Sequence, residues 1–165
     1  MKKFITLNKY GELYIDKILF ETYFPIIFTC KNENNDIFIC VCCQCNENGC
    51  KWLVGRTNGS FIVRMLQNEI TIRQLLLDCC TEKISVDYKN QEYAIAYNNS
   101  DWNEESDYLP KKDAYIDAEG GEFDEEIAYF TSIEHVEYNE EYYKIIIKEL
   151  STIGNTIDPL LDSIT

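Results

Sequence analysis

The sequence predicts an α+β fold: an antiparallel meander sheet of about six strands with helices packed on it, in a single domain. Three observations indicate this. Short apolar runs alternate with polar turns over residues 13–56 and 83–98, two helix-like stretches lie between these regions, and 165 residues suit one core. We place the domain over residues 1–154 and expect a loosely ordered tail over residues 155–165.

The stretch 37–56 is expected to form the central hairpin of this sheet. Two apolar runs flank a polar turn that ends in Gly49, the residue that such turns favour. Because side chains alternate across a strand, the first run has two apolar faces, one with Ile39, Val41, Cys43 and Cys45 and the other with Phe38, Cys40 and Cys42. A strand without a polar face belongs in the middle of a sheet that is covered on both sides.

Four further apolar runs are predicted as strands, over residues 13–20, 26–30, 83–89 and 92–98. The first two complete a meander with the central hairpin. The last two surround Asn90 and Gln91 and form a second hairpin, in which Ile84, Val86 and Tyr88 share a face with Tyr93, Ile95 and Tyr97.

Helices are expected between and after these strands. Residues 57–60 cap a short helix over 61–67, and Thr71 with Gln74 forms a capping box that opens a helix to about residue 80. An acidic first turn after Gly121 predicts a third helix, to about residue 134. Residues 140–153 fit a strand through Ile145–Ile147 or a helix with Tyr142, Ile146 and Leu150 on one side; we choose helix and leave the alternative open.

Composition favours a soluble protein of the cytoplasm. The start at Met1 is basic like that of a signal peptide, but the polar residues Asn8, Lys9, Glu12 and Asp16 leave no uninterrupted apolar region after it. No apolar run approaches the roughly 20 residues of a membrane span. We therefore expect cytoplasmic localisation, no membrane contact and reduced thiols.

Negative charge is concentrated in the second half of the chain. Residues 1–80 carry nine Lys/Arg and eight Asp/Glu, whereas residues 81–165 carry six and twenty-one. The densest part, residues 101–126, holds eleven acids against Lys111 and Lys112. Such a potential repels nucleic acid and anionic lipid and attracts basic surfaces, although a charge run can also serve only as a solvated face.

Tyrosines lie between these carboxylates and add apolar contact area, which together suits a basic partner. The residues predicted to bind it are Asp101, Glu104, Glu105, Asp107, Tyr108, Tyr115, Asp117, Glu119, Glu122, Asp124, Glu125 and Glu126. On a helix, Glu122 would stand about 5 to 6 Å from Glu125 and Glu126, a spacing comparable with that of phosphates along a strand. We expect a non-enzymatic acidic protein that binds and inhibits a basic, nucleic-acid-handling protein, as an anti-defence or immunity-type inhibitor does, by mimicking nucleic acid rather than binding it.

The eight cysteines give the main alternative, a metal-binding or redox module centred on Cys42, Cys43, Cys45 and Cys50. Strand alternation sends Cys43 and Cys45 to the face opposite Cys42, so convergence on one metal ion requires the strand to break. Reduced cysteines also serve as small core residues. Cys45 and Cys50 are expected to lie opposite each other at the hairpin mouth, close enough to oxidise.

Enzymatic chemistry has little support. The single histidine, His135, stands between Glu134 and Glu137, where carboxylates favour its charged form over a general base. Residues from Asp117 onward offer oxygens for calcium but lack the closing glutamate of an EF-hand, and no Gly-rich phosphate loop is present in the sequence. We expect no catalytic residue and no cofactor.

Four segments carry a resemblance to another group of proteins: LYIDKILF, PIIFTCKN, KWLVGRT and ITIRQLL. In their order they look like small uncharacterised domains of bacteria and their phages. The resemblance covers about the first half of the chain. It implies a bacterial or phage setting and brings no active-site residues with it.

Overall fold

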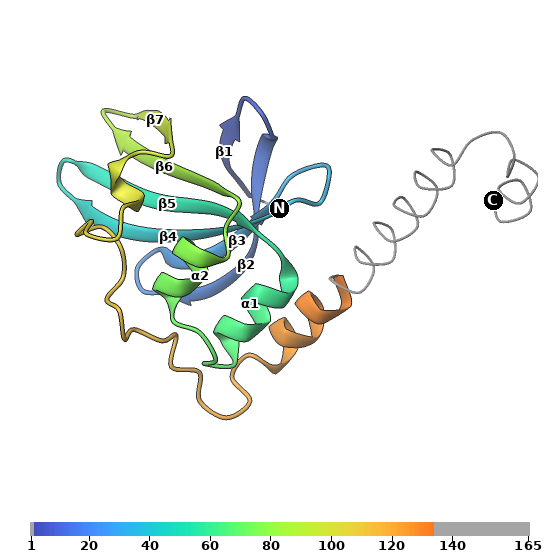
Figure 1. The fold of residues 1–165 in the computed structure, drawn as a ribbon. Coiled ribbons are helices and arrows are strands. Elements are labelled where there is room, and N and C mark those ends of the chain that lie inside the picture. Colours follow the sequence, from blue (N-terminus) through green and yellow to red (C-terminus); the bar gives the residue numbers. More distant parts are fainter. Residues whose placement is uncertain (1, 134–165) are drawn as a thin grey trace, which may run out of the picture.

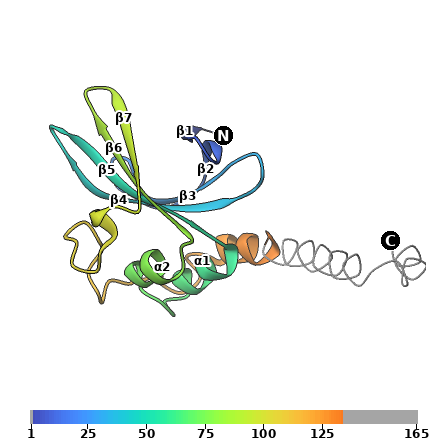
Figure 2. The same ribbon diagram turned by 45° about the horizontal axis from the view of Figure 1, so that its top comes forward.

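A computed structural model describes residues 2–133 of the chain. Its centre is a seven-stranded antiparallel sheet in the order β1-β2-β3-β4-β5-β6-β7, curled until it is nearly a barrel (Figure 1, Figure 2). The strands are β1 (Lys3–Leu7), β2 (Gly11–Glu21), β3 (Pro25–Lys31), β4 (Ile37–Asn46), β5 (Gly49–Thr57), β6 (Glu82–Lys89) and β7 (Glu92–Tyr97). The helices are α1 (Gly59–Leu66), α2 (Ile72–Asp78), the 3-10 turn η1 (Ser100–Trp102) and a helix over 124–133.

The strand that the sequence pattern did not predict is β1, which raises the number from about six to seven. Its alternating residues Ile5 and Leu7 are buried, and Gly11, at φ 74°, provides the turn into β2. Only two buried residues mark this strand, which is too short a pattern to stand out beside the basic start of the chain. The antiparallel meander with packed helices is confirmed.

The two predicted hairpins are confirmed; the second keeps its predicted register throughout, whereas the central one contains a β-bulge between Cys42 and Gln44. Ile37 pairs with Thr57 and Cys45 with Cys50 across the central hairpin. In the second hairpin the facing pairs match the predicted faces: Ile84 with Tyr97, Val86 with Ile95 and Tyr88 with Tyr93. Asn90 and Gln91 both have positive φ, as a two-residue hairpin turn requires.

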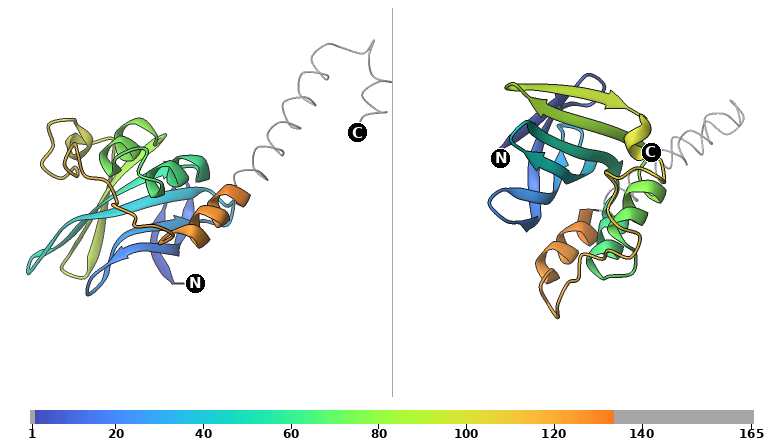
Figure 3. Two further views of the ribbon diagram at one scale, coloured as in Figure 1. Left: turned by 90° about the horizontal axis from the view of Figure 1, so that it is seen from below. Right: turned by 90° about the vertical axis from the view of Figure 1, so that its left-hand side faces the viewer.

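Two apolar cores lie on opposite faces of the sheet. On one face, α1, α2 and the helix over 124–133 cover Ile39 and Leu53 (Figure 3). On the concave face, Phe38 and Val54 pack with Phe28 from β3 and Ile84 from β6. Neighbouring residues of β4 therefore enter different cores, which confirms the prediction that this strand is covered on both sides.

Side chains rather than strand pairing close the curled sheet. Tyr10, in the turn after β1, donates a hydrogen bond of 2.9 Å to Glu82 at the start of β6, and Lys9 Nζ lies 2.6 Å from the same carboxylate. The ring of Phe4 contacts that of Trp52 at 5.3 Å between centroids. Within residues 2–133, β1 and β7 do not pair, so the sheet keeps two free edges.

The helix caps follow from the sequence. The Asn58 side chain accepts a hydrogen bond from the Phe61 amide at 3.1 Å and caps α1. Thr71 Oγ1 accepts from the Gln74 amide at 3.1 Å, and Gln74 Oε1 accepts from the Thr71 amide at 2.8 Å, which confirms the capping box of α2.

Several predictions lie outside the described residues: the helix or strand over 140–153, the domain boundary at 154, the tail over 155–165 and His135. Among the helices within residues 2–133, none has the length and apolar character to cross a membrane.

Candidate functional site

The acidic segment, residues 101–126, begins at an anchored turn. Asn99 Oδ1 accepts hydrogen bonds from the Asp101 amide at 3.1 Å and from the Ser85 hydroxyl at 2.9 Å, which fixes η1 to β6. Trp102 follows and is buried at 5% exposure against the helical face of the sheet. A Cβ atom added at Gly55 of β5 would overlap the Cys80 thiol and lie 3.3 Å from the Trp102 ring, so this glycine gives space to both side chains.

Asp101 is held inside the protein by Lys51 of β5. Lys51 Nζ lies 2.8 Å from Asp101 and 3.0 Å from Asp87, and its side chain is only 12% exposed. The Lys51 ammonium also lies 4.8 Å from the centre of the Tyr108 ring. The charge of Asp101 is thus balanced within the chain.

The pKa values agree with this arrangement. Burial by itself would raise the pKa of Asp101, but the hydrogen bond and charge of Lys51 outweigh burial and lower it. Burial would likewise lower the pKa of Lys51, yet its bonds to Asp101 and Asp87 raise it. Both groups are charged at neutral pH.

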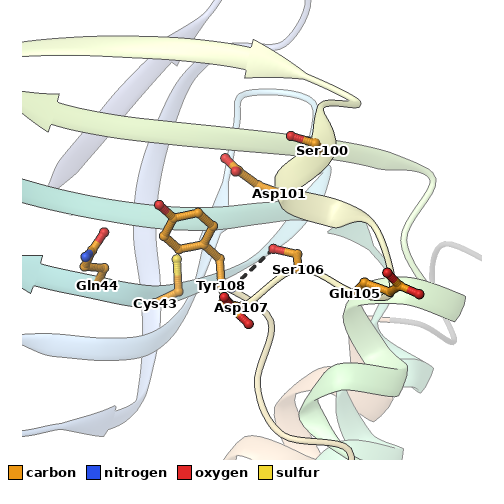
Figure 4. Close-up of a pocket in the computed structure, with 8 residues that line it drawn as sticks. All are labelled: Cys43, Gln44, Ser100, Asp101, Glu105, Ser106, Asp107 and Tyr108. Atoms are coloured by element: carbon orange, nitrogen blue, oxygen red, sulfur yellow. Dashed lines mark hydrogen bonds between the residues drawn. The ribbon is translucent and has the colours of Figure 1, made fainter.

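Beyond η1, a short run of carboxylates surrounds a pocket on the surface. Glu104, Glu105 and Asp107, which we call the loop group, are exposed. Two of them line an open pocket of about 560 Å³, whose walls are Cys43, Gln44, Ser100, Asp101, Glu105, Ser106, Asp107 and Tyr108 (Figure 4). The Tyr108 amide donates a hydrogen bond of 3.2 Å to Ser106 Oγ, which shapes the loop at this wall.

A second set of carboxylates lies where the helix over 124–133 begins. We call Asp117, Glu119, Glu122, Asp124 and Glu125 the helix group, and all five are exposed. Asn68 holds this turn through both of its side-chain atoms, donating to the Ala118 carbonyl at 3.2 Å and accepting from its amide at 3.4 Å. Phe123 and Phe130 are buried and pack this part of the chain against the core, so Asp124 and Glu125 face outward.

The helix begins slightly later than its acidic residues suggested. Glu122 precedes it and accepts a hydrogen bond from the Glu119 amide at 3.1 Å, and Glu126 is half-buried. The predicted helical row of Glu122, Glu125 and Glu126 is therefore incomplete. The acidic turn instead lies at the N-terminal, positive end of the helix, where carboxylates are favoured.

The predicted binding residues fall into two groups along the chain, with Tyr115 between them. Residues 109–116 run past α2 and separate the loop group from the helix group (Figure 1). The Ile72 amide donates to the Ala114 carbonyl at 3.1 Å, and Arg73 donates to the carbonyls of Pro110 and Glu104, which hold this connection. Tyr115, one of the two predicted anchors, is 40% exposed within it.

The cysteines are dispersed, but the prediction that Cys43 and Cys45 share a face is wrong. A β-bulge between Cys42 and Gln44 shifts the alternation, so Cys45 lies on the face of Cys42 and Trp52, whereas Cys43 packs on the helical face. A disulfide joins Cys45 and Cys50 across the central hairpin. Cys43 lines the pocket, whereas Cys42 pairs with Trp52 in the sheet. Burial raises the pKa of the Cys43 thiol to about 12 and also raises that of Cys42, so both thiols stay protonated at neutral pH. Within residues 2–133, no three potential ligands lie close enough to hold a metal ion.

Sequence reasoning missed the residues that anchor the site. Lys51 lies fifty residues before Asp101, and nothing local links the two positions. Trp102 gave a signal, because it is a large apolar residue with polar neighbours on both sides in a polar loop. Such a residue more often packs into a core than stays in solvent.

Comparison with known proteins found no match to a family model, to a curated protein or to a solved structure. A function for this chain is therefore inferred from its own geometry.

Proposed function

We propose that this chain is a non-enzymatic interaction protein whose loop group and helix group bind a basic protein, of the kind that handles nucleic acid, and inhibit it. The partner's lysines and arginines would pair with carboxylates that this chain leaves without a cation. Tyr108 and Tyr115 would add contact area beside them.

One contrast carries this proposal. Six of the eleven acidic residues in the range 2–97 form ion pairs, namely Glu12, Asp16, Asp36, Glu69, Glu82 and Asp87. Of the ten acidic residues in the range 104–126, none has an ion-pair partner among residues 2–133. The chain thus pairs more than half of its carboxylates in residues 2–97 and leaves those of residues 104–126 without an ion pair among the described residues.

The pocket beside the loop group supports the same function. A flexible cationic side chain entering it would meet Glu105 and Asp107 on one side and the Tyr108 ring on another. Carboxylates accept two hydrogen bonds from a guanidinium, and an aromatic face attracts a cation. Asp101 belongs to the wall but not to the proposed binding set, because Lys51 already pairs with it.

Charge reversal tests the proposal directly. The probe is the set of proteins that heparin retains from a bacterial extract, because these carry basic nucleic-acid-binding surfaces. The immobilised chain should capture members of this set at low salt and release them as salt rises past the physiological range, since exposed charges are screened over about 8 to 10 Å. Added duplex DNA should compete for the same captured proteins.

Three variants with equal charge change separate the segment from the rest of the chain. One reverses the loop group, with Glu104→Lys, Glu105→Lys and Asp107→Lys. The second reverses three members of the helix group, with Glu122→Lys, Asp124→Lys and Glu125→Lys. The control reverses exposed acids of the sheet and its turns that have no ion pair in the structure: Glu21→Lys, Glu33→Lys and Glu47→Lys. Capture should be lost in at least one of the first two and kept in the control. Equal capture by all three would contradict the proposal.

A further inference from the structure

The outer edge of β7 is a free strand edge of unusual regularity. Its register with β6 runs from Lys89–Glu92 to Ile84–Tyr97 without a bulge. No strand pairs with this edge within residues 2–133 (Figures 1 and 2), and β1 reaches it through a side chain, with 6.2 Å between the ring centroids of Phe4 and Tyr93. The opposite edge, β1, carries Lys2 and Lys3 and has an irregular register between Lys3 and Ile5. Lysines and bulges protect an edge from pairing, and β7 has neither within residues 93–97.

The hydrogen-bond pattern shows which groups this edge offers. The Asn98 amide donates to the Lys83 carbonyl at 2.8 Å, so the pair 83–98 is a bonded one. Antiparallel ladders alternate bonded and non-bonded pairs, which directs residues 94 and 96 toward β6. The N–H and C=O groups of Tyr93, Ile95 and Tyr97 therefore point outward, to the open edge.

The sequence of the edge is a palindrome, Tyr93-Ala94-Ile95-Ala96-Tyr97. When two copies pair antiparallel about Ile95, Ile95 faces Ile95 and Tyr93 faces Tyr97 in bonded pairs, and Ala94 faces Ala96 between them. The outward groups of each copy thus meet their complements, with six hydrogen bonds between the chains. A two-fold contact requires this self-complementarity.

Charge also permits this contact. Residues 93–97 are uncharged in a chain of net charge −14, so two copies can approach along this edge without facing like charges. The same pairing brings the turn flanked by Lys89 and Glu92 toward the end of β7 in the second copy, so this turn adds one charge of each sign beside the contact. Tyr93 is 46% exposed and Tyr97 40%, which leaves apolar area to bury.

We propose that β7 pairs with β7 of a second copy of this chain, antiparallel and centred on Ile95, to form a two-fold homodimer with a continuous fourteen-stranded sheet. Asn98, at φ 50°, leaves the extended conformation and limits the pairing to five residues. The contact is small beside the roughly 1,600 Å² of a standard interface, so the dimer forms in a concentration-dependent way.

Two double variants test the register. Ala94 and Ala96 are exposed and face each other across the proposed two-fold axis. Ala94→Lys with Ala96→Lys puts lysine opposite lysine in the dimer, whereas Ala94→Lys with Ala96→Glu puts lysine opposite glutamate. Sedimentation velocity over about two decades of concentration should show dimer for the wild type and for the Lys/Glu variant. The dissociation constant of the Lys/Lys variant should be at least about tenfold higher.

Amide hydrogen exchange gives a second readout that needs no variant. Raising the protein concentration should slow exchange at the amides of Tyr93, Ile95 and Tyr97 and leave those of Ala94 and Ala96 unchanged, because only the first three point outward. A wild type that stays monomeric over the whole range would overturn the proposal. So would equal dimerisation of both double variants, or exchange at residues 93, 95 and 97 that does not depend on concentration.

Discussion

The sheet and the acidic segment treat charge in opposite ways. Residues 2–97 hold eleven basic and eleven acidic residues, and more than half of the acids are paired. Residues 104–126 hold ten acids and two lysines, and none of these acids is paired within residues 2–133. Asp101 and Lys51 join the two regions. The difference indicates that charges in the sheet serve the fold, whereas those of the segment are left for another role.

The largest effect is expected at the doubly covered sheet. Phe38 is fully buried in the concave core, so Phe38→Ala should lower the free energy of unfolding by about 3 to 5 kcal/mol. Tyr23→Ala, at a fully exposed position of the turn between β2 and β3, should change it by less than about 0.5 kcal/mol. Urea unfolding measures both. A loss below about 1 kcal/mol for Phe38→Ala would show that the concave core does not hold the sheet.

An intermediate effect is expected at the junction of the two regions. Lys51→Met leaves Asp101 and Asp87 without their cation and should cost about 1 to 3 kcal/mol at neutral pH. Because folding lowers the pKa of Asp101 below its ordinary 3.8, the stability from this pair is present above about pH 4 and is lost as pH falls further. The difference between wild type and variant should therefore shrink in acid. An equal difference from pH 7 to pH 2 would contradict this assignment.

The smallest effect is expected in the segment itself. Neutralising the loop group with Glu104→Gln, Glu105→Gln and Asp107→Asn should change the unfolding free energy by less than about 0.5 kcal/mol. A single neutralisation in the turn between β3 and β4, Asp36→Asn, removes a charge that lies 2.8 Å from Arg56 and should cost more. If the loop-group variant proved the less stable of the two, its carboxylates would be structural.

Local patterns predicted most of the fold. The alternation in 37–56 and 83–98 specified both hairpins, because a slip of one residue would move every apolar side chain to the other face. The capping box at Thr71 could also be predicted from a local pattern, because its two partners are only three residues apart. The strand β1 was not predicted, because its two buried residues are too few to show an alternating pattern.

Contacts between distant residues could not be predicted in the same way. The sheet curls until Tyr10 reaches Glu82, a contact across seventy-two residues, and no local pattern announces it. Lys51 and Asp101 are fifty residues apart and share no motif. Sequence patterns therefore gave no reason to distinguish Asp101 from the other carboxylates of the segment. The connection along α2 that divides the acidic residues into two groups also depends on such contacts, chiefly those of Arg73.

The order of the strands has a consequence for how the chain reaches this structure. Every strand pairs with its neighbour in sequence, so strand pairing can spread in both directions from the tight turn between β4 and β5. Between β1 and β7, the only long connection is the helical stretch between β5 and β6. The other connections are short and lose little entropy on closing, which favours rapid folding for a sheet protein. The aromatic seam at Phe4 and Trp52 forms last on such a route, and it is where the native molecule should first open.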